Sequence, residues 1–165
     1  MLKTPHLLLA GNPRKVRANL THILSDAALT AIDSEINKNI RGLVLLGVGH
    51  QTFANGLDRA HWRQIVSRTY YAAYTFSRAV RLCHDGHYVA DVTDHKMLGL
   101  LPDGFHNKNR YANKLPLLRD DRNLCDYDHS ATEADLVIPV NEAEVLVSEF
   151  LFDVNLYLGE RGVAQ

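Results

Sequence analysis

The stretch that decides the fold runs from Asp58 to His84 and reads DRAHWRQIVSRTYYAAYTFSRAVRLCH. Its apolar residues recur three to four positions apart, which is the spacing of one face of an α-helix and not of a strand. The members of that face are Trp62, Ile65, Val66, Thr69, Ala73, Phe76 and Val80. Gly86 lies just past the stretch and suits the left-handed residue that often follows a helix end. We therefore predict one long amphipathic helix that begins at Asp58 and ends at Asp85-Gly86.

Two further helix starts are visible on the N-terminal side of this helix. Asn12 precedes Pro13, and Ser25 precedes Asp26. Asn and Ser are favoured N-caps, and Pro is favoured at the first helical position. The second of these helices is expected to end near Gly47–Gly49. Its apolar stripe consists of Leu29, Ile32, Ile36, Ile40, Leu43 and Gly47.

The segment after Gly86 is less regular. A short helix is expected to begin at Thr93 or Asp94. Residues 107–126 have helical spacing, but Pro116 lacks an N–H group and should interrupt the helix there. Residues 134–140 are the only strand candidate, and a weak one.

The last helix has the clearest ends. Asn141 can cap it, Glu144 occupies the capping-box position, and Gly159 follows its last apolar residues. The pattern as a whole predicts an all-α fold, an antiparallel up-and-down bundle of four to five helices. Residues 1–27 would form an N-terminal extension with a short helix, and residues 28–165 the bundle domain.

Composition narrows the class of protein. The chain has 165 residues, of which 46% are hydrophobic, enough for a core without metal or disulfide bonds. Lys and Arg number 18 against 19 for Asp and Glu, so any contact with RNA must come from a local basic patch. The two cysteines, Cys83 and Cys125, form no CxxC pair, and no apolar run is long enough to span a membrane. We expect a soluble, cytoplasmic protein that does not enter a membrane.

Two segments carry residues suited to chemistry. Ser67 to Tyr74 reads SRTYYAAY within the long helix, and Arg119 to His129 reads RDDRNLCDYDH. The first has the form S-x-x-YYAAY and the second contains R-N-x-x-D-Y-D, and a closing amphipathic helix follows. In this order and at these separations, the sequence resembles the HEPN family of helical-bundle proteins over roughly residues 28–158.

The resemblance implies a function as well as a fold. Many HEPN proteins are metal-independent endoribonucleases with an R-x(4–6)-H motif, which Arg122 and His129 match with six residues between them. Asn123 fits the polar residue that often follows the Arg. The resemblance further implies a homodimer that joins two motifs at one site, without a cofactor. RNA would be the substrate, and a nucleotidyltransferase-like antitoxin is a candidate partner if the protein is a toxin or a defence protein.

The chemistry of these side chains is compatible with that assignment. A His that titrates near neutrality can deprotonate a ribose 2′-hydroxyl or protonate the leaving oxygen. An Arg fork can hold the scissile phosphate, and Arg119 would add phosphate affinity. If the helix continues past Arg122, then Asp126 and His129 lie on its same face, where Asp126 and Tyr127 would support the pair. Ser67 and Arg68 are the other candidates for substrate binding, although a solvated helix face also accounts for Arg68, Arg78 and Arg81.

Two alternatives remain open. The commonest HEPN form places the His five residues after the Arg, where this chain has Tyr127, and R-N-x-x-D-Y-D resembles a subgroup in which that His is often missing. The chain would then be a non-catalytic HEPN dimer that binds a protein or a nucleotide, with Arg122 and Asp126 joined in a salt bridge. A metal-dependent hydrolase is the third reading, but its ligand-type residues match no strong motif, so we predict no metal site; they are Cys83, His84, Asp85, His87, Asp91 and His95.

Overall fold

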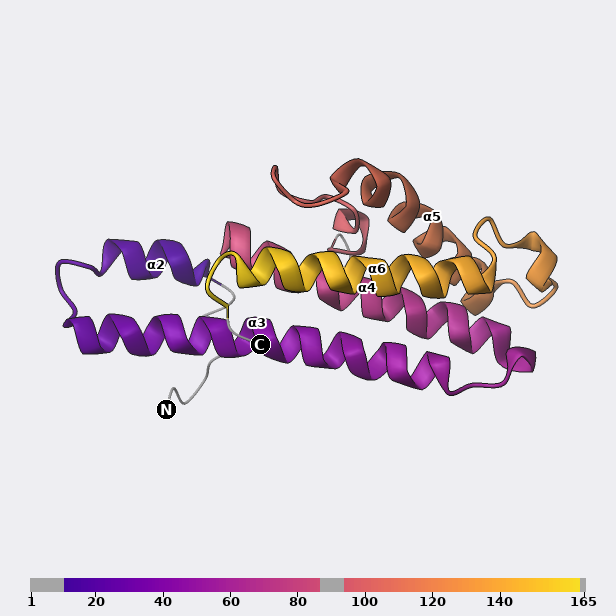
Figure 1. The fold of residues 1–165 in the computed structure, drawn as a ribbon, viewed down its shortest axis with the longest axis horizontal. Helices are drawn as coiled ribbons and strands as arrows, with labels where there is room; N and C mark the ends of the chain where they lie inside the picture. The colour runs from indigo at the N-terminus through magenta and orange to yellow at the C-terminus, as the bar shows by residue number, and fades with distance from the viewer. Residues whose placement is uncertain (1–10, 87–93, 164–165) are drawn as a thin grey trace.

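The computed structural model describes residues 11–86 and 94–163, and these form an all-helical bundle (Figure 1). The α-helices are α2 (Pro13–Asn19), α3 (Asp26–Asn55), α4 (Trp62–Asp85), α5 (Lys108–Tyr127) and α6 (Val140–Gly159). Three 3-10 turns join them, namely η1 (Arg59–His61), η2 (Asp94–Met97) and η3 (Glu133–Asp135). No strand occurs in the two described ranges. The predicted fold class is confirmed.

Helix α4, which contains most of the stretch that decides the fold, is the centre of the bundle. It begins at Trp62 and not at Asp58 as predicted, because Asp58 caps the 3-10 turn η1. It packs against α3, α5 and α6, and in Figure 1 it lies between α3 below and α5 above. Its central part is apolar or small on nearly every face, which is typical of a buried helix. The largest side chains that are completely enclosed in the core are Tyr70, Tyr111, Tyr157, Phe76 and Phe150. The four long helices therefore share one hydrophobic core.

Three predicted helix ends are confirmed, two by side-chain capping bonds and one by the backbone conformation of a glycine. The Asn12 side chain accepts a hydrogen bond from the Lys15 N–H at 3.2 Å, and the Ser25 hydroxyl accepts one from the Ala28 N–H at 3.3 Å. Gly86 ends α4 with φ 75°, a left-handed conformation that Gly adopts without strain. Local sequence signals are sufficient at these positions because capping involves only neighbouring residues.

The expected end of α3 near Gly47–Gly49 is wrong, because the helix continues to Asn55. Gly47 is buried where α3 meets α4, and a Cβ at this position would lie 2.3 Å from Cε1 of Phe76. This glycine therefore allows two helix backbones to come close together. Burial of the Phe76 ring against α3 stabilises the pair of helices and outweighs the low helix propensity of Gly.

Two other helix boundaries also differ from expectation. Helix α5 is continuous through Pro116, where the sequence predicted an interruption. Helix α6 begins at Val140, so Asn141 lies inside it, and the N-cap residue Pro139 makes no side-chain capping bond. The region of the weak strand candidate contains the end of η3 and an irregular segment instead. Packing against the rest of the bundle overrides the local preference of the chain at each of these places.

The N-terminal extension packs on the bundle, and the segment that starts at Asp94 is shorter than expected. Helix α2 lies along the first half of α3 (Figure 1), where Arg17 forms an ion pair of 2.9 Å with Asp33. The short helix expected from Thr93 or Asp94 is one 3-10 turn at Asp94, and Thr93 lies outside the described residues. No helix in the described part of the chain is both long and apolar enough to cross a membrane.

Substitution of Gly47 by alanine is expected to lower the free energy of unfolding by about 1–3 kcal/mol, because the new methyl group would overlap the Phe76 ring. Gly49 on the same helix is the matched control, since a Cβ there meets no atom within 4 Å. Gly49→Ala should raise stability by up to about 1 kcal/mol through helix propensity alone. Urea denaturation followed by circular dichroism measures both values, and equal effects at the two glycines would contradict the proposed close packing.

Candidate functional site

Arg122, on α5, lies among three tyrosine side chains, two from α4 and one from α5. Its guanidinium carbon lies 5.7 Å from the ring centre of Tyr70, 5.2 Å from that of Tyr71 and 5.7 Å from that of Tyr127. Its Nη2 donates a hydrogen bond of 2.5 Å to the Tyr71 hydroxyl, and its Nε forms an ion pair of 2.8 Å with Asp126. Flat aromatic faces and a fixed acceptor restrict the guanidinium to one orientation.

The charge of Arg122 is well supported. Burial by itself lowers the pKa of this guanidinium, but charge interactions with Tyr71 and Asp126 and hydrogen bonds to Tyr127 and Tyr71 outweigh it and raise the pKa. Its side chain is 16% exposed, so it keeps some access to solvent. The result is a permanent, pre-oriented cation at the surface of the bundle.

The residues predicted to support Arg122 do surround it. Asn123 accepts a hydrogen bond of 3.1 Å from Arg122 Nη1, while Asp126 and Tyr127 make the contacts given above. Arg119, one turn earlier on α5, lies beside Asp120 in an ion pair of 2.9 Å. The structure thus brings this part of the predicted site together around one arginine.

His129 is placed differently. Helix α5 ends at Tyr127, Asp128 is extended with φ −100° and ψ 104°, and His129 lies exposed in the turn that follows. The condition under which His129 would share a helical face with Arg122 and Asp126 is therefore not met.

Arg63 on α4 contacts the turn that follows α5. It is not among the site residues predicted from the sequence. Its guanidinium donates to the main-chain carbonyls of Cys125, Asp128 and Ala131 at 2.9, 2.7 and 2.5 Å. These bonds satisfy carbonyl groups at the helix end and hold the turn that carries His129 against α4. No local sequence signal reveals such a contact, because Arg63 is distant along the chain.

Neither candidate on α4, Ser67 or Arg68, is among the hydrogen-bond and ion-pair partners of Arg122 in the described residues. Ser67 is buried at 9% exposure, and Arg68 stacks its guanidinium 5.4 Å from the ring centre of Phe53 on α3. Neither residue lines the pocket described next. Arg81 was expected on a solvated helix face or in an RNA groove, but it is buried.

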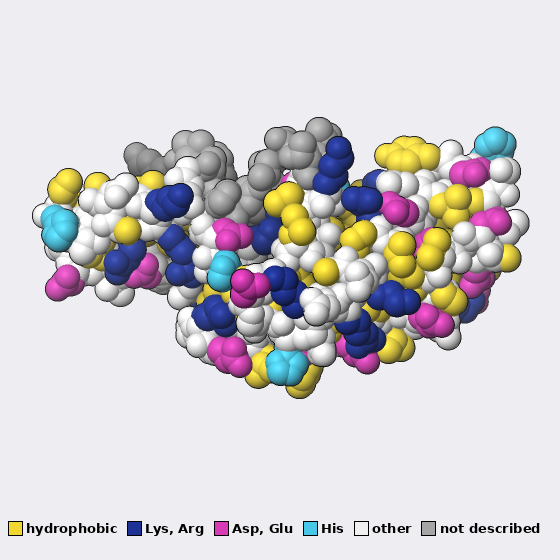
Figure 2. All heavy atoms as spheres, turned by 90° about the horizontal axis from the view of Figure 1, so that it is seen from above, with side chains coloured by type: hydrophobic (Ala, Val, Ile, Leu, Met, Phe, Trp, Pro, Cys, Tyr) yellow, Lys and Arg dark blue, Asp and Glu magenta, His cyan; other side chains and the backbone are white. Residues whose placement is uncertain are grey.

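A hollow of about 460 Å³ opens beside Arg122, between η2 and α5. We call it the Arg122 pocket; its lining residues are Tyr70, His95, Lys96, Arg119, Asp120, Arg122 and Asn123. Three permanent cations and one histidine face a single carboxylate, which is paired with Arg119. The face of the bundle on which α5 lies otherwise mixes basic, acidic and apolar side chains (Figure 2). A local anion site is therefore more consistent with this surface than an extended basic groove.

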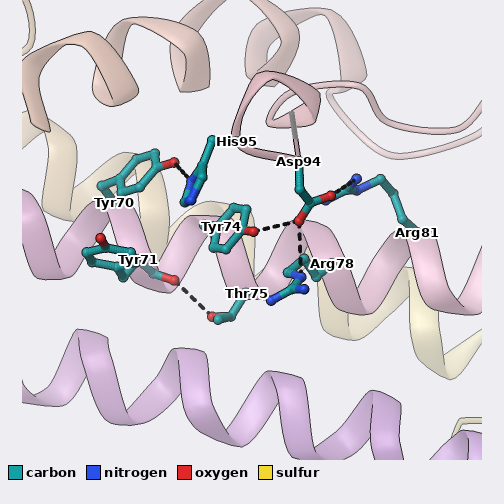
Figure 3. A network of polar contacts seen from close by, with 8 residues as sticks. All are labelled: Tyr70, Tyr71, Tyr74, Thr75, Arg78, Arg81, Asp94 and His95. Carbon is teal, nitrogen blue, oxygen red and sulfur yellow. Dashed lines mark hydrogen bonds and ion pairs between the residues drawn. The ribbon is translucent and has the colours of Figure 1, made fainter. Parts of the chain in front are cut away.

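A buried ion-pair network fixes η2, and with it His95, on α4 (Figure 3). Asp94 is completely buried and accepts hydrogen bonds from Arg81 Nη1 and from the Tyr74 hydroxyl, each at 2.6 Å. Arg78 adds an ion pair of 3.1 Å to the same carboxylate. Two arginines and a tyrosine on one helix thus hold the carboxylate of the residue just before His95.

Of the six residues considered as metal ligands, the structure describes Cys83, His84, Asp85 and His95. Cys83 is a buried free thiol near Arg14, and His84 Nδ1 lies 2.8 Å from the Tyr157 hydroxyl. His87 and Asp91 lie outside the described residues. Within residues 11–86 and 94–163, no three His, Cys, Asp or Glu side chains are grouped as metal ligands.

Comparison of the chain with family models, curated proteins and solved structures finds no match.

Proposed function

We propose that this chain is a HEPN-type, metal-independent endoribonuclease that acts as a homodimer and binds the scissile phosphate of RNA in the Arg122 pocket. The observation that carries the proposal is the pocket itself, in which Lys96, Arg119 and Arg122 face the same hollow. Arg presents a planar fork that matches the geometry of a phosphate. The volume of about 460 Å³ is in the range of sites for small ligands and accommodates one nucleotide.

The chemistry follows from positioning and charge. The ribose 2′-hydroxyl attacks the adjacent phosphorus while a base removes its proton, and the 5′-oxygen leaves and takes up a proton. Negative charge grows on the phosphate oxygens during this step, and the fixed Arg122 guanidinium, with Arg119 beside it, stabilises that charge. The products are a 2′,3′-cyclic phosphate and a 5′-hydroxyl. By the R-x(4–6)-H pattern, His129 of the exposed turn would complete the site, contributed across the dimer.

A HEPN-type nuclease of this kind would serve as a toxin or a defence protein. Its RNase activity would then need control inside the cell, and a nucleotidyltransferase-like antitoxin is the partner that the resemblance suggests. Arg122 belongs to the surface that such a partner would have to cover in order to block activity.

One observation favours the second candidate function, a non-catalytic dimer that binds a protein or a nucleotide. Arg122 already has Tyr71 and Asp126 as partners, and His129 lies past the end of the helix that carries the arginine. A pocket of this kind can bind an anion without performing chemistry. The two functions differ in one measurable respect, which is whether RNA is cut.

The test is incubation of the purified full chain with total RNA and with tRNA in the presence of EDTA. Wild type should produce fragments that end in a 2′,3′-cyclic phosphate, and Arg122→Gln should lose that activity. Arg110→Gln is the matched control, because Arg110 lies on the same helix, pairs with Glu149 and does not line the pocket. A folded wild-type dimer that leaves RNA intact would refute the proposal in favour of the binding module. Equal cleavage of RNA by both variants would refute the role of the Arg122 pocket in the reaction.

A further inference from the structure

His95 is the only histidine that lines the Arg122 pocket as the structure describes it. It lies on η2, whereas Arg119 and Arg122 lie on α5, so the pocket combines two elements that are distant in sequence. The imidazole stacks on the Tyr74 ring with centroids 4.4 Å apart and planes inclined by 16°. With Asp94 buried just before it, His95 has both its backbone and its ring plane fixed (Figure 3).

The hydrogen bonding of His95 decides which ring nitrogen can meet a substrate. Nδ1 lies 2.6 Å from the Tyr70 hydroxyl, so this nitrogen is engaged. Nε2 has no hydrogen-bond partner among the described residues and is the nitrogen that remains for a ligand. When Nδ1 carries the proton and donates it to Tyr70, Nε2 holds a free lone pair and can act as a base.

The surroundings of His95 favour its neutral form. Burial and the positive charge of Arg122 lower the pKa of His95, with smaller contributions from Arg78 and Arg119, while Asp94 acts in the opposite direction. Burial also raises the pKa of Tyr70 to about 12, so this phenol stays protonated near neutrality. The titratable and charged groups that surround the imidazole from α4, η2 and α5 are Tyr70, Tyr74, Arg78, Asp94, Lys96, Arg119, Asp120 and Arg122.

We propose that His95, and not His129, is the base that removes the proton from the ribose 2′-hydroxyl. This inference rests on the proposed endoribonuclease function and names a residue that the R-x(4–6)-H pattern does not include. His95 Nε2 takes the proton, the 2′-oxygen forms a bond to phosphorus, and the bond from phosphorus to the 5′-oxygen breaks. The 5′-oxygen then takes a proton from water or from His129. Arg122 holds the phosphate in the same pocket, so the base and the phosphate ligand come from one subunit.

The position of His129 supports this division of roles. Its turn is held by Arg63, and it is absent from the lining of the pocket in one subunit. A histidine that reaches the site only across a dimer can protonate a leaving group on the far side of the phosphate. In-line attack at phosphorus needs the base on the side opposite the leaving oxygen, and His95 shares the pocket with the phosphate ligand Arg122.

The test compares two RNA substrates of the same sequence, cut by wild type at one mapped position. In the second substrate, sulfur replaces the bridging 5′-oxygen at that position, so that the leaving thiolate needs no proton. Loss of a base slows cleavage of both substrates, whereas loss of an acid slows only the oxygen substrate. The variants are His95→Gln, whose amide can still bind Tyr70, and His129→Ala.

His95→Gln is expected to slow cleavage of both substrates by about 100-fold or more, the usual contribution of a general base. Cleavage of the sulfur substrate by His95→Gln at the wild-type rate would overturn the inference and leave the endoribonuclease function intact. If His129→Ala lost cleavage of both substrates and His95→Gln did not, the base would be His129 instead. A wild type that cuts neither substrate would refute the endoribonuclease function itself, together with this inference.

A second measurement does not depend on activity and also controls for folding. NMR titration of the wild type should give His95 a pKa below 6.5, with Nδ1 protonated in the neutral ring. In Arg122→Gln the pKa should rise, because one positive charge that opposes protonation has been removed. A His95 that titrates above 6.5, or that carries its proton on Nε2, would contradict the role of a base near neutral pH.

Discussion

Replacement of Asp94 by alanine is expected to lower the free energy of unfolding by about 3–5 kcal/mol, the usual effect of breaking a buried ion pair. The carboxylate is completely buried; it forms ion pairs with Arg81 and Arg78 and accepts a hydrogen bond from Tyr74. Its loss leaves the Arg81 side chain, which is 5% exposed, as a buried charge without its carboxylate partner. Arg78 is affected less, because its side chain is 20% exposed and can reach water. Urea denaturation followed by circular dichroism measures the change.

Asp103→Ala provides the matched control for that measurement. Asp103 also forms an ion pair of 2.6 Å, with Lys108, but its side chain is fully exposed, so its removal should have little effect on stability. The double variant Asp94→Ala with Arg81→Met should be more stable than Asp94→Ala alone, because the uncompensated buried cation is gone. Similar stability losses in Asp94→Ala and Asp103→Ala would show that water reaches the network and that its charges are not buried.

This network has a functional meaning as well as a cost. A buried ion pair usually adds little net stability compared with apolar packing. It does, however, fix one geometry, since Asp94 can satisfy Arg81 and Tyr74 at once only in one position on α4. The following residue, His95, is thereby placed against Tyr70 and Tyr74. Loss of Asp94 should therefore also disturb the chemical shifts of His95.

The sequence predicts the helical fold and those helix ends at which neighbouring residues form the cap. The starts at Asn12 and Ser25 and the end at Gly86 depend on neighbouring residues, and the apolar stripes depend on the helical period. The errors occur at Gly47 and Pro116, which lie inside helices although Gly and Pro normally end them, and at Asn141, since α6 begins at Val140. Contacts with another element, such as Phe76 against Gly47, decide those positions, and a single sequence does not reveal them.

Some residues of the candidate site can likewise be predicted from the sequence, and others cannot. Asp126 lies four positions after Arg122 on one helix, so helical spacing already indicates their ion pair. Asn123 and Tyr127, one and five positions after Arg122, also contact it, but helical spacing does not indicate those contacts. His95 reaches the same pocket from a different element, through packing of η2 on α4, and the sequence suggested it only as part of a weak metal cluster. One signal could have helped: Arg78 and Arg81, three positions apart on a largely apolar helix, call for a buried acidic partner, and Asp94 is that partner.

Arg122→Lys is expected to lower kcat for RNA cleavage by about 100- to 1000-fold, although the positive charge is kept. A lysine is a flexible point charge and does not reproduce the fork that contacts Tyr71 and Asp126 at the same time. Binding of RNA should change little. It is measured with an oligonucleotide that carries a 2′-O-methyl group at the cleaved position, which prevents the reaction.

Arg119→Gln is the comparison variant, and we expect it to weaken RNA binding more than it lowers kcat. Arg119 contributes charge to the pocket without the tyrosine contacts that orient Arg122. Its loss should weaken RNA binding and reduce the slope of log affinity against log salt by about one, while kcat at saturating RNA changes less. If Arg122→Lys instead lost affinity and kept kcat, the arginine would stabilise the bound RNA and the transition state equally. That outcome would make the Arg122 pocket a binding site for RNA without a specific part in the chemical step.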